Sequence, residues 1–253
     1  MKITILYSSG LDSFILKSLA DSKNYEVKCI YYAHGAESEA KELALLPDFV
    51  EVRKIDWLSE TNKPVAKTDD TFAGNIYIPG RNLILCALAA CQEMPDEVWM
   101  GTMWDEDNEK GTDKNEIFRH RTSELLSYVL SPFTKSVKIV FPFVELGWTK
   151  YDAVKWALNN NISSQTLINT VSCWHHDGTL PCGECKQCFK RNLVFRLNGF
   201  SETYKSDPSY NEYGKNLANK YLSEYDECNK DEQTVVNMLV RLNNIKLHGD
   251  HYG

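Results

Sequence analysis

The strongest constraint on the fold is the alternation of short apolar segments with amphipathic ones along residues 1–169. Short runs rich in β-branched residues predict buried strands, whereas apolar residues recurring every three or four positions predict helices. Strands joined through helices favour a mostly parallel sheet with helices on both faces. We therefore predict an α/β fold with a five-stranded sheet. The predicted strands lie at 3–7, 26–32, 49–55, 97–102 and 137–141, and the predicted helices lie around 14–19, 37–46, 82–94, 116–130 and 150–159.

Residues 170–253 differ in character from the preceding part. A cysteine-rich loop opens this region and leads into a predicted helix at 189–197. Beyond Phe200 the chain is polar, and one further helix is predicted at 235–247. We therefore expect an α/β domain over 1–169 and a C-terminal region over 170–253 that holds the cysteine loop and a few helices.

The charge balance limits the possible partners. The chain has 28 Lys and Arg against 35 Asp and Glu, a net charge of −7, which argues against nonspecific binding to nucleic acid or to an anionic membrane. No apolar run approaches the roughly 20 residues of a membrane-spanning helix, and the N-terminal sequence lacks the pattern of a secretory signal. We expect a cytoplasmic protein whose cysteines are reduced.

Four of the eight cysteines are clustered. Cys182, Cys185 and Cys188 are spaced as two overlapping C-x₂-C turns, and Cys173 precedes them by nine residues. Such turns present thiolates to one point, and a fourth cysteine completes a tetrahedral site with no open position. The spacing predicts a closed, structural zinc site with these four cysteines as ligands.

Two alternatives to this zinc site remain open from the sequence. An iron–sulfur cluster is one, although the run lacks the C-x₃-C-P ending of bacterial ferredoxins. His175 or His176 could also replace Cys173 as a ligand. Lys186, Lys190 and Arg191 follow the cysteines, and we expect their charges to offset the negative charge of a zinc–thiolate centre.

The turn between the first strand and the first helix, residues 8–13, has the sequence SSGLDS. A short Ser/Gly turn at a helix N-terminus directs backbone N–H groups outward, where they can bind an anion. The ends of parallel strands are also where ligands bind in such sheets. The alternative is an ordinary turn with an Asp or Ser cap. The segment matches neither the GxxxxGK[ST] loop nor the GxGxxG fingerprint.

This turn resembles the SGGxDS loop of the PP-loop ATPases, which split ATP into AMP and pyrophosphate. The resemblance implies a Rossmann-like domain that binds ATP with Mg²⁺, with Asp12 placing the metal or orienting the loop in catalysis. Ser9 stands where the family pattern has its first glycine, and a backbone angle with positive φ would disfavour serine there. The nucleotide-binding residues implied by the resemblance are Tyr7, Ser8, Ser9, Gly10, Leu11, Asp12 and Ser13.

Further motifs narrow the resemblance. An IPGRN segment at 78–82 and the C-x₈-C-x₂-C-x₂-C spacing accompany the Ser/Gly turn. Together they resemble the QueC family of 7-cyano-7-deazaguanine synthases. FPF at 141–143, followed by Thr149-Lys150, and DPSY at 207–210 also resemble family segments. The resemblance extends over residues 3–210.

The QueC resemblance implies roles for several residues. Arg81 would contact phosphate as a catalytic group, although a helix-start arginine exposed to solvent is the alternative. Asn82 would contact the nucleotide or, alternatively, cap its helix. Ile30 and Tyr31 would meet adenine through their backbone. Lys150 would reach phosphate or lie in solvent at a helix start.

Two segments depart from the family pattern. Residues 109–116 replace an SGYPDCR-like stretch near the deazapurine pocket and retain only Asp113 and Glu116. The YGQxH segment after the second strand is altered to YYAHG at 31–35. Trp174 could stack on a purine or pack over the zinc loop. The nucleotide end of the site therefore matches the family better than the acceptor end.

The resemblance implies an ATP-dependent ligase that makes 7-cyano-7-deazaguanine from 7-carboxy-7-deazaguanine and ammonia, through an adenylated acid and an adenylated amide. It also implies a homodimer. Three alternatives remain: a QueC-like enzyme with another acceptor, a PP-loop tRNA-modifying enzyme, and an inactive zinc- and nucleotide-binding module. We expect no direct binding to nucleic acid or membrane.

Overall fold

The structure is a computed structural model, and it divides into two compact units, Met1–Trp148 and Thr149–Gly253. The division into functional domains at residues 169 and 170 stays a prediction. The structure describes residues 1–35, 39–58, 63–64, 76–77, 80–106, 113–134, 136–173, 175–176 and 178–243.

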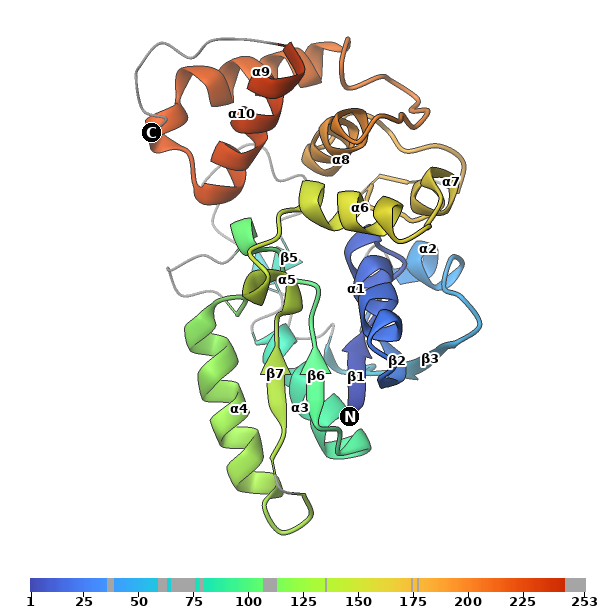
Figure 1. The fold of residues 1–253 in the computed structure, drawn as a ribbon, viewed down its shortest axis with the longest axis vertical. Coiled ribbons are helices and arrows are strands. Elements are labelled where there is room, and N and C mark those ends of the chain that lie inside the picture. Colours follow the sequence, from blue (N-terminus) through green and yellow to red (C-terminus); the bar gives the residue numbers. More distant parts are fainter. Residues whose placement is uncertain are drawn as a thin grey trace. The chain divides into compact units, whose positions relative to one another are not determined.

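The first unit is built on a parallel sheet (Figure 1). Its five strands are β1 (Lys2–Leu6), β2 (Glu26–Ala33), β3 (Val50–Lys54), β6 (Glu97–Trp99) and β7 (Lys138–Val140). They lie in the order β3-β2-β1-β6-β7, and every neighbouring pair is parallel. The prediction of a five-stranded parallel sheet is thus confirmed. A separate antiparallel pair comprises β4 (Lys63–Pro64) and β5 (Ile76–Tyr77).

Helices cover both faces of this sheet. The helical elements of the unit are α1 (Leu11–Ser22), α2 (Glu39–Leu43), α3 (Arg81–Glu93), η2 (Trp104–Glu106), α4 (Glu116–Leu130) and α5 (Pro142–Glu145). Ile30 and Tyr32 of β2 pack in one core cluster with Cys86 of α3 and Leu126 of α4. Because side chains alternate along a strand, Cys29 points to the opposite face, where α1 contacts β1 and β2.

The second unit is helical. Its elements are α6 (Lys150–Asn159), α7 (Ser164–Ile168), α8 (Lys186–Leu197), α9 (Glu212–Ser223), η3 (Tyr225–Glu227) and α10 (Lys230–Asn243). α8 packs against both α6 and α10, and α10 also packs against α9. Among the described residues, no helix is long and apolar enough to cross a membrane.

Several helix boundaries differ from those expected from the sequence. α8 begins at Lys186, earlier than residue 189, because Cys185 acts as its N-cap. α10 begins at Lys230, earlier than residue 235, while residues 244–247 of the predicted helix lie outside the described residues. α9 was not expected, since Leu217 and Tyr221 are its only large buried side chains.

Candidate nucleotide site and candidate metal centre

The turn between β1 and α1 is held closed by one serine side chain. The Ser13 hydroxyl lies 2.7 Å from the Ser8 carbonyl oxygen and 3.0 Å from that of Gly10, and it accepts from the Ser8 N–H at 3.2 Å. The Gly10 N–H in turn donates to the Ser8 hydroxyl at 3.2 Å. Ser13 therefore fixes the shape of the turn from within.

Ser9 fits this turn without strain. The described non-glycine residues with positive φ are Asn24, Met94 and Asn161, so Ser9 needs no glycine-like conformation. Gly10 has φ of −76°, which any residue can adopt. Ser9 is buried, and its Oγ has no hydrogen-bond partner among the residues described. The departure from the family pattern thus adds a hydroxyl to the turn at no backbone cost.

The start of α1 has no side-chain cap. Its N-cap residue is Gly10, so the interpretation of the turn as an ordinary Asp or Ser cap is wrong. The first N–H groups of a helix have no partner within it. Those of Leu11, Asp12 and Ser13 therefore lie at the positive end of the α1 dipole, with the Asp12 carboxylate in the first turn. Such an arrangement can bind an anion.

Gly101, which sequence reasoning missed, lies against this helix start. A Cβ at Gly101 would be 3.4 Å from the Cβ of Asp12 and 3.6 Å from the Ser13 nitrogen. A methyl group at this position would make ordinary van der Waals contact with Asp12 and Ser13, so the segment after β6 runs directly beside the turn. The sequence signal was a glycine near the end of a predicted strand. Its contact with Asp12 could not be predicted, because the two residues are far apart in the sequence.

The structure places Tyr7, Ile30 and Tyr31 beside the turn. The Tyr7 N–H donates to the Ile30 carbonyl at 2.9 Å, one residue beyond the last β1–β2 pair of Leu6 and Ile30. That carbonyl is therefore already engaged within the sheet. Tyr31 is buried, and burial raises the pKa of its hydroxyl. Base contacts from Ile30 and Tyr31 stay a prediction.

His34 lies in the altered segment 31–35, but the sequence indicated no role for this residue of its own. It follows β2 directly and is buried. Its Nδ1 lies 2.8 Å from the Tyr32 carbonyl oxygen, whereas its buried Nε2 has no partner in the described part of the chain. The sequence signal was a histidine at the end of a predicted strand, but burial could not be read from the pattern.

The start of α3 joins two segments that the sequence analysis treated separately. Asn82 is buried, and its backbone N–H and side-chain amide donate to the carboxylate and carbonyl of Asp113, both at 3.3 Å. Asn82 is not the helix cap, since Gly80 holds that position with φ of 69°. Arg81 is exposed. Residues 78–79 and 109–112 lie outside the described residues.

These groups belong to one edge of the sheet. Helices that connect parallel strands run back antiparallel to them, so the starts of α1, α3 and α4 lie at the carboxyl ends of the strands. The turn at 8–13, His34, Asn82 and Asp113 therefore share that edge within the first unit. This is the edge at which open parallel sheets bind ligands.

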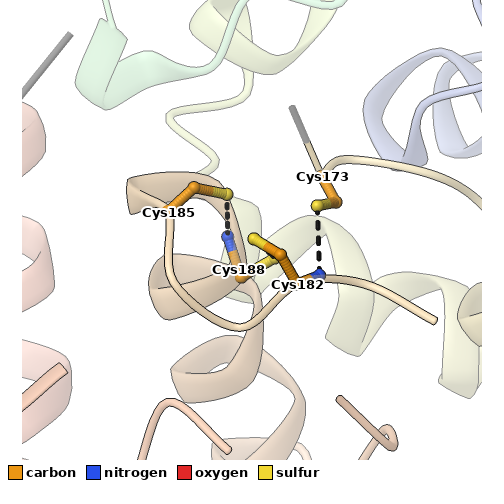
Figure 2. Close-up of side chains that lie close together, drawn as sticks. All are labelled: Cys173, Cys182, Cys185 and Cys188. Atoms are coloured by element: carbon orange, nitrogen blue, oxygen red, sulfur yellow. Dashed lines mark hydrogen bonds between the residues drawn. The ribbon is translucent and has the colours of Figure 1, made fainter. Parts of the chain in front are cut away.

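In the second unit the four clustered cysteines converge (Figure 2). The sulfurs of Cys173, Cys182, Cys185 and Cys188 all lie within 4.8 Å of one another. The sulfurs of Cys182 and Cys188 are 3.9 Å apart. A Zn–S bond of about 2.3 Å gives tetrahedral sulfur–sulfur separations of about 3.8 Å. The four thiols are thus close enough together that they could hold a metal ion.

Backbone N–H groups point at these sulfurs. Cys182 donates to the Cys173 sulfur at 3.3 Å, and Cys188 donates to the Cys185 sulfur at 3.5 Å (Figure 2). Glu184 donates to the Cys182 sulfur at 3.3 Å. Hydrogen bonds from the Cys185 and Cys188 thiols lower the pKa of Cys173, so the cluster favours a thiolate at that position. Neither His175 nor His176 belongs to the group of potential ligands among the described residues.

Gly183 lets the cysteine turn contact a distant loop. It has φ of +78°, and a Cβ there would lie 1.6 Å from the Ser206 carbonyl oxygen. The Ser206 N–H donates to the Cys182 carbonyl at 3.2 Å, and the Asn211 side chain donates to the Gly183 carbonyl at 2.9 Å. The loop before α9 therefore supports the turn from outside.

Arg191 ties the Cys173 arm to α8. Its buried guanidinium pairs with Glu202 through bonds of 2.7 and 3.2 Å. It also donates to the carbonyls and hydroxyls of residues 167–172, which lead directly to Cys173. One side chain thus holds both segments that carry the ligands.

The cations beside the cysteines have carboxylate partners. Lys190 forms an ion pair with Asp231, and Lys186 lies 3.5 Å from Asp231 and 3.4 Å from Glu232. Burial alone would raise the pKa of Asp231. The positive charges of Lys190, Lys186 and Lys150 lower that pKa by more than burial raises it, so the net shift is downward. Our expectation that Lys186, Lys190 and Arg191 offset the thiolate charge overlooked these partners. Lys150 is buried in this unit, not solvated.

Fold and sites together define a class: an α/β protein with a turn of the PP-loop kind and a closed set of four thiols. A family profile described as queuosine biosynthesis protein QueC matches residues 2–199. The chain belongs to the QueC family. A 7-cyano-7-deazaguanine synthase from Nitratiruptor sp. is 27% identical, and the match covers 82% of this chain and 97% of that relative. One from Methanococcus maripaludis is 24% identical, covering 81% of this chain and 98% of the relative.

Among solved structures, the tRNA thiolase NcsA from Methanococcus maripaludis, with its iron–sulfur cluster, matches with a TM-score of 0.39 and 12% identity. That match covers 100% of this chain and 76% of the other.

Proposed function

We propose that the protein is an ATP-dependent 7-cyano-7-deazaguanine synthase that converts 7-carboxy-7-deazaguanine and ammonia to the nitrile. The observation that carries the proposal is the uncapped turn at residues 8–13, in a chain whose family membership spans the whole α/β unit. The curated relatives bear the name of this activity over nearly their full length.

The chemistry requires two activations. The carboxylate attacks the α-phosphorus of ATP and releases pyrophosphate, and ammonia then displaces AMP to give the amide. The amide oxygen attacks a second ATP in the same way, and loss of AMP and a proton leaves the nitrile. Both attacks build charge on phosphate, so catalysis rests on positioning and charge stabilisation.

Residues of the first unit suit these tasks. The N–H groups at the start of α1, those of residues 11–13, and the Ser9 hydroxyl would hold the departing pyrophosphate, while the Ser8 and Gly10 N–H groups keep the turn closed. Arg81, exposed at the start of α3, would stabilise negative charge on phosphate as a catalytic group. Asp12 would place the Mg²⁺ that accompanies ATP, and Asn82 would act through its bonds with Asp113.

We propose that the four cysteines hold one structural Zn²⁺. The sulfur separations suit a single tetrahedral ion, because an iron–sulfur cluster would spread its cysteines over several irons. All four positions would be filled by protein, so the ion would stabilise the fold and take no part in the reaction.

We further propose that residues 1–169 carry ATP binding and residues 170–253 carry the metal. In this proposal the protein works in the cytoplasm as a homodimer, without direct contact with nucleic acid or membrane. The net charge of −7 supports the absence of nucleic-acid binding.

The test is incubation of the purified protein with ATP, Mg²⁺, ammonium and 7-carboxy-7-deazaguanine, with AMP and products followed by mass spectrometry. We expect nitrile and two AMP per nitrile. AMP with a stalled amide or an adenylated acid would indicate another acceptor, for which the altered segment 109–116 would be responsible. Absence of AMP from metal-replete protein would overturn the proposal and leave a binding module.

A further inference from the structure

His34 is a buried side chain that no activity step described above uses. Its residue exposure is 9%, and it follows β2 at the edge where the Ser9 turn follows β1. β1 and β2 are hydrogen-bonded neighbours. Each strand end therefore carries one buried polar atom without a partner among the described residues, Ser9 Oγ and His34 Nε2.

The bond at the other ring nitrogen sets the chemistry of this atom. A carbonyl oxygen only accepts hydrogen bonds, so the 2.8 Å contact with the Tyr32 carbonyl requires the hydrogen to be on Nδ1. In the neutral ring, Nε2 is then an acceptor. A buried acceptor without a donor costs free energy, which a ligand that supplies an N–H or O–H recovers.

The two atoms are chemically complementary. Ser9 Oγ can donate a hydrogen bond to a phosphate oxygen, whereas neutral His34 Nε2 cannot. The donors of ATP lie in its nucleoside, namely the ribose hydroxyls and the exocyclic amine of adenine. We propose that His34 is a nucleoside-recognition residue, whose Nε2 accepts a hydrogen bond from one of these donors while the neighbouring turn holds phosphate. This inference rests on the proposed ATP binding and specifies how the nucleoside is selected.

Two substitutions separate the roles of the two ring nitrogens. His34→Asn keeps a donor near the Nδ1 position for the Tyr32 carbonyl and removes the acceptor at Nε2. His34→Gln places a side-chain carbonyl near the Nε2 position and restores the acceptor. Comparable thermal unfolding of both variants and the wild type would show that the fold is intact.

The experiment measures binding by calorimetry without the acid acceptor, for ATP, 2′-deoxyATP, 3′-deoxyATP, inosine triphosphate and pyrophosphate. We expect His34→Asn to weaken ATP binding roughly three- to tenfold, the value of one hydrogen bond, and His34→Gln to weaken it less. For the analogue that lacks the contacted donor, the wild type and the His34→Asn variant should have the same affinity. Their affinities for pyrophosphate should also be equal.

The outcomes distinguish the two levels of the proposal. If the wild type binds ATP and His34→Asn changes no nucleotide, or weakens all of them by one common factor, the nucleoside role is overturned. Weaker pyrophosphate binding by His34→Asn would overturn it in favour of a phosphate contact. If the wild type binds no ATP at all, the proposed function fails, and this inference fails with it.

Discussion

The two candidate sites differ in what their buried polar groups contact. At the cysteine cluster the buried Tyr204 hydroxyl has no partner among the described residues, but the buried charge of Arg191 is paired with Glu202 and residues 167–172, and backbone N–H groups already point at the sulfurs. At the strand edge, by contrast, Ser9 Oγ and His34 Nε2 are buried without partners among the described residues. The first site is built to be held rigid, whereas the second retains groups that a ligand must satisfy.

The largest expected effect tests the rigidity of the metal centre. Gly183→Ala would place a methyl group 1.6 Å from the Ser206 carbonyl oxygen, in a conformation that disfavours L-residues. We expect a loss of about 3 kcal/mol or more in the free energy of unfolding, together with loss of bound metal. Elemental analysis and denaturant unfolding would measure both.

Gly178→Ala is the matched control for Gly183→Ala. Gly178 also has positive φ, at +93°, but no atom of the described residues lies within 4 Å of a Cβ there. We expect a cost of about 1–2 kcal/mol with metal retained. Equal effects of the two substitutions would show that backbone conformation, and not the contact with Ser206, decides the behaviour of this loop.

The next effect concerns the buried arginine. Arg191→Met leaves the Glu202 carboxylate buried without its cation, which costs about 3–5 kcal/mol, and frees the arm that leads to Cys173. Adding Glu202→Gln should restore part of that stability, because the unpaired charge is removed. Arg196→Met, at an exposed position of the same helix, should have little effect. Urea unfolding of the wild type, the two single variants and the double variant would measure these stabilities. An Arg191→Met protein as stable as the wild type would show that this buried ion pair does not stabilise the fold.

A smaller effect is expected at the strand edge. Ser13→Ala removes the bonds that close the turn, and we expect ATP binding to weaken about tenfold while the unfolding free energy changes less than in Arg191→Met. Ser18→Ala is the control, since its hydroxyl donates to the Phe14 carbonyl within α1 at 3.0 Å, away from the turn. Calorimetric ATP binding is the measurement. Unchanged affinity in Ser13→Ala would show that the turn does not hold the nucleotide.

The smallest effect depends on pH. The net downward shift of the Asp231 pKa means that its ion pairs stabilise the fold above the usual aspartate pKa of about 4. This contribution disappears as pH falls through the folded-state pKa. Asp231→Asn should therefore be less stable than wild type near neutral pH, and the difference should shrink below about pH 4. A difference that does not vary with pH, measured by urea unfolding, would contradict the lowered pKa.

The sequence predicted what depends on local pattern. Apolar periodicity placed the five strands of the parallel sheet and the helices α1, α2, α3 and α4, but not the short α5 and η2, and C-x₂-C spacing predicted the four cysteines that converge. The sequence did not predict features that depend on contacts between residues far apart in the chain. Nothing in the pattern around Gly183 indicates that Ser206 packs against it, and a histidine after a strand does not reveal a buried acceptor. α9 was missed because its buried side chains are too few to form a clear stripe.

The residues around the cysteine cluster are close together in the sequence, which affects the order in which parts of the chain can fold during synthesis. The cysteines, the Arg191 network and the supporting loop all lie between residues 167 and 211. The ion pair of Lys190 with Asp231, in contrast, reaches 41 residues ahead. On a growing chain the thiols can therefore meet before α10 has emerged from the ribosome, so that the proposed metal ion could be bound before the last helix docks.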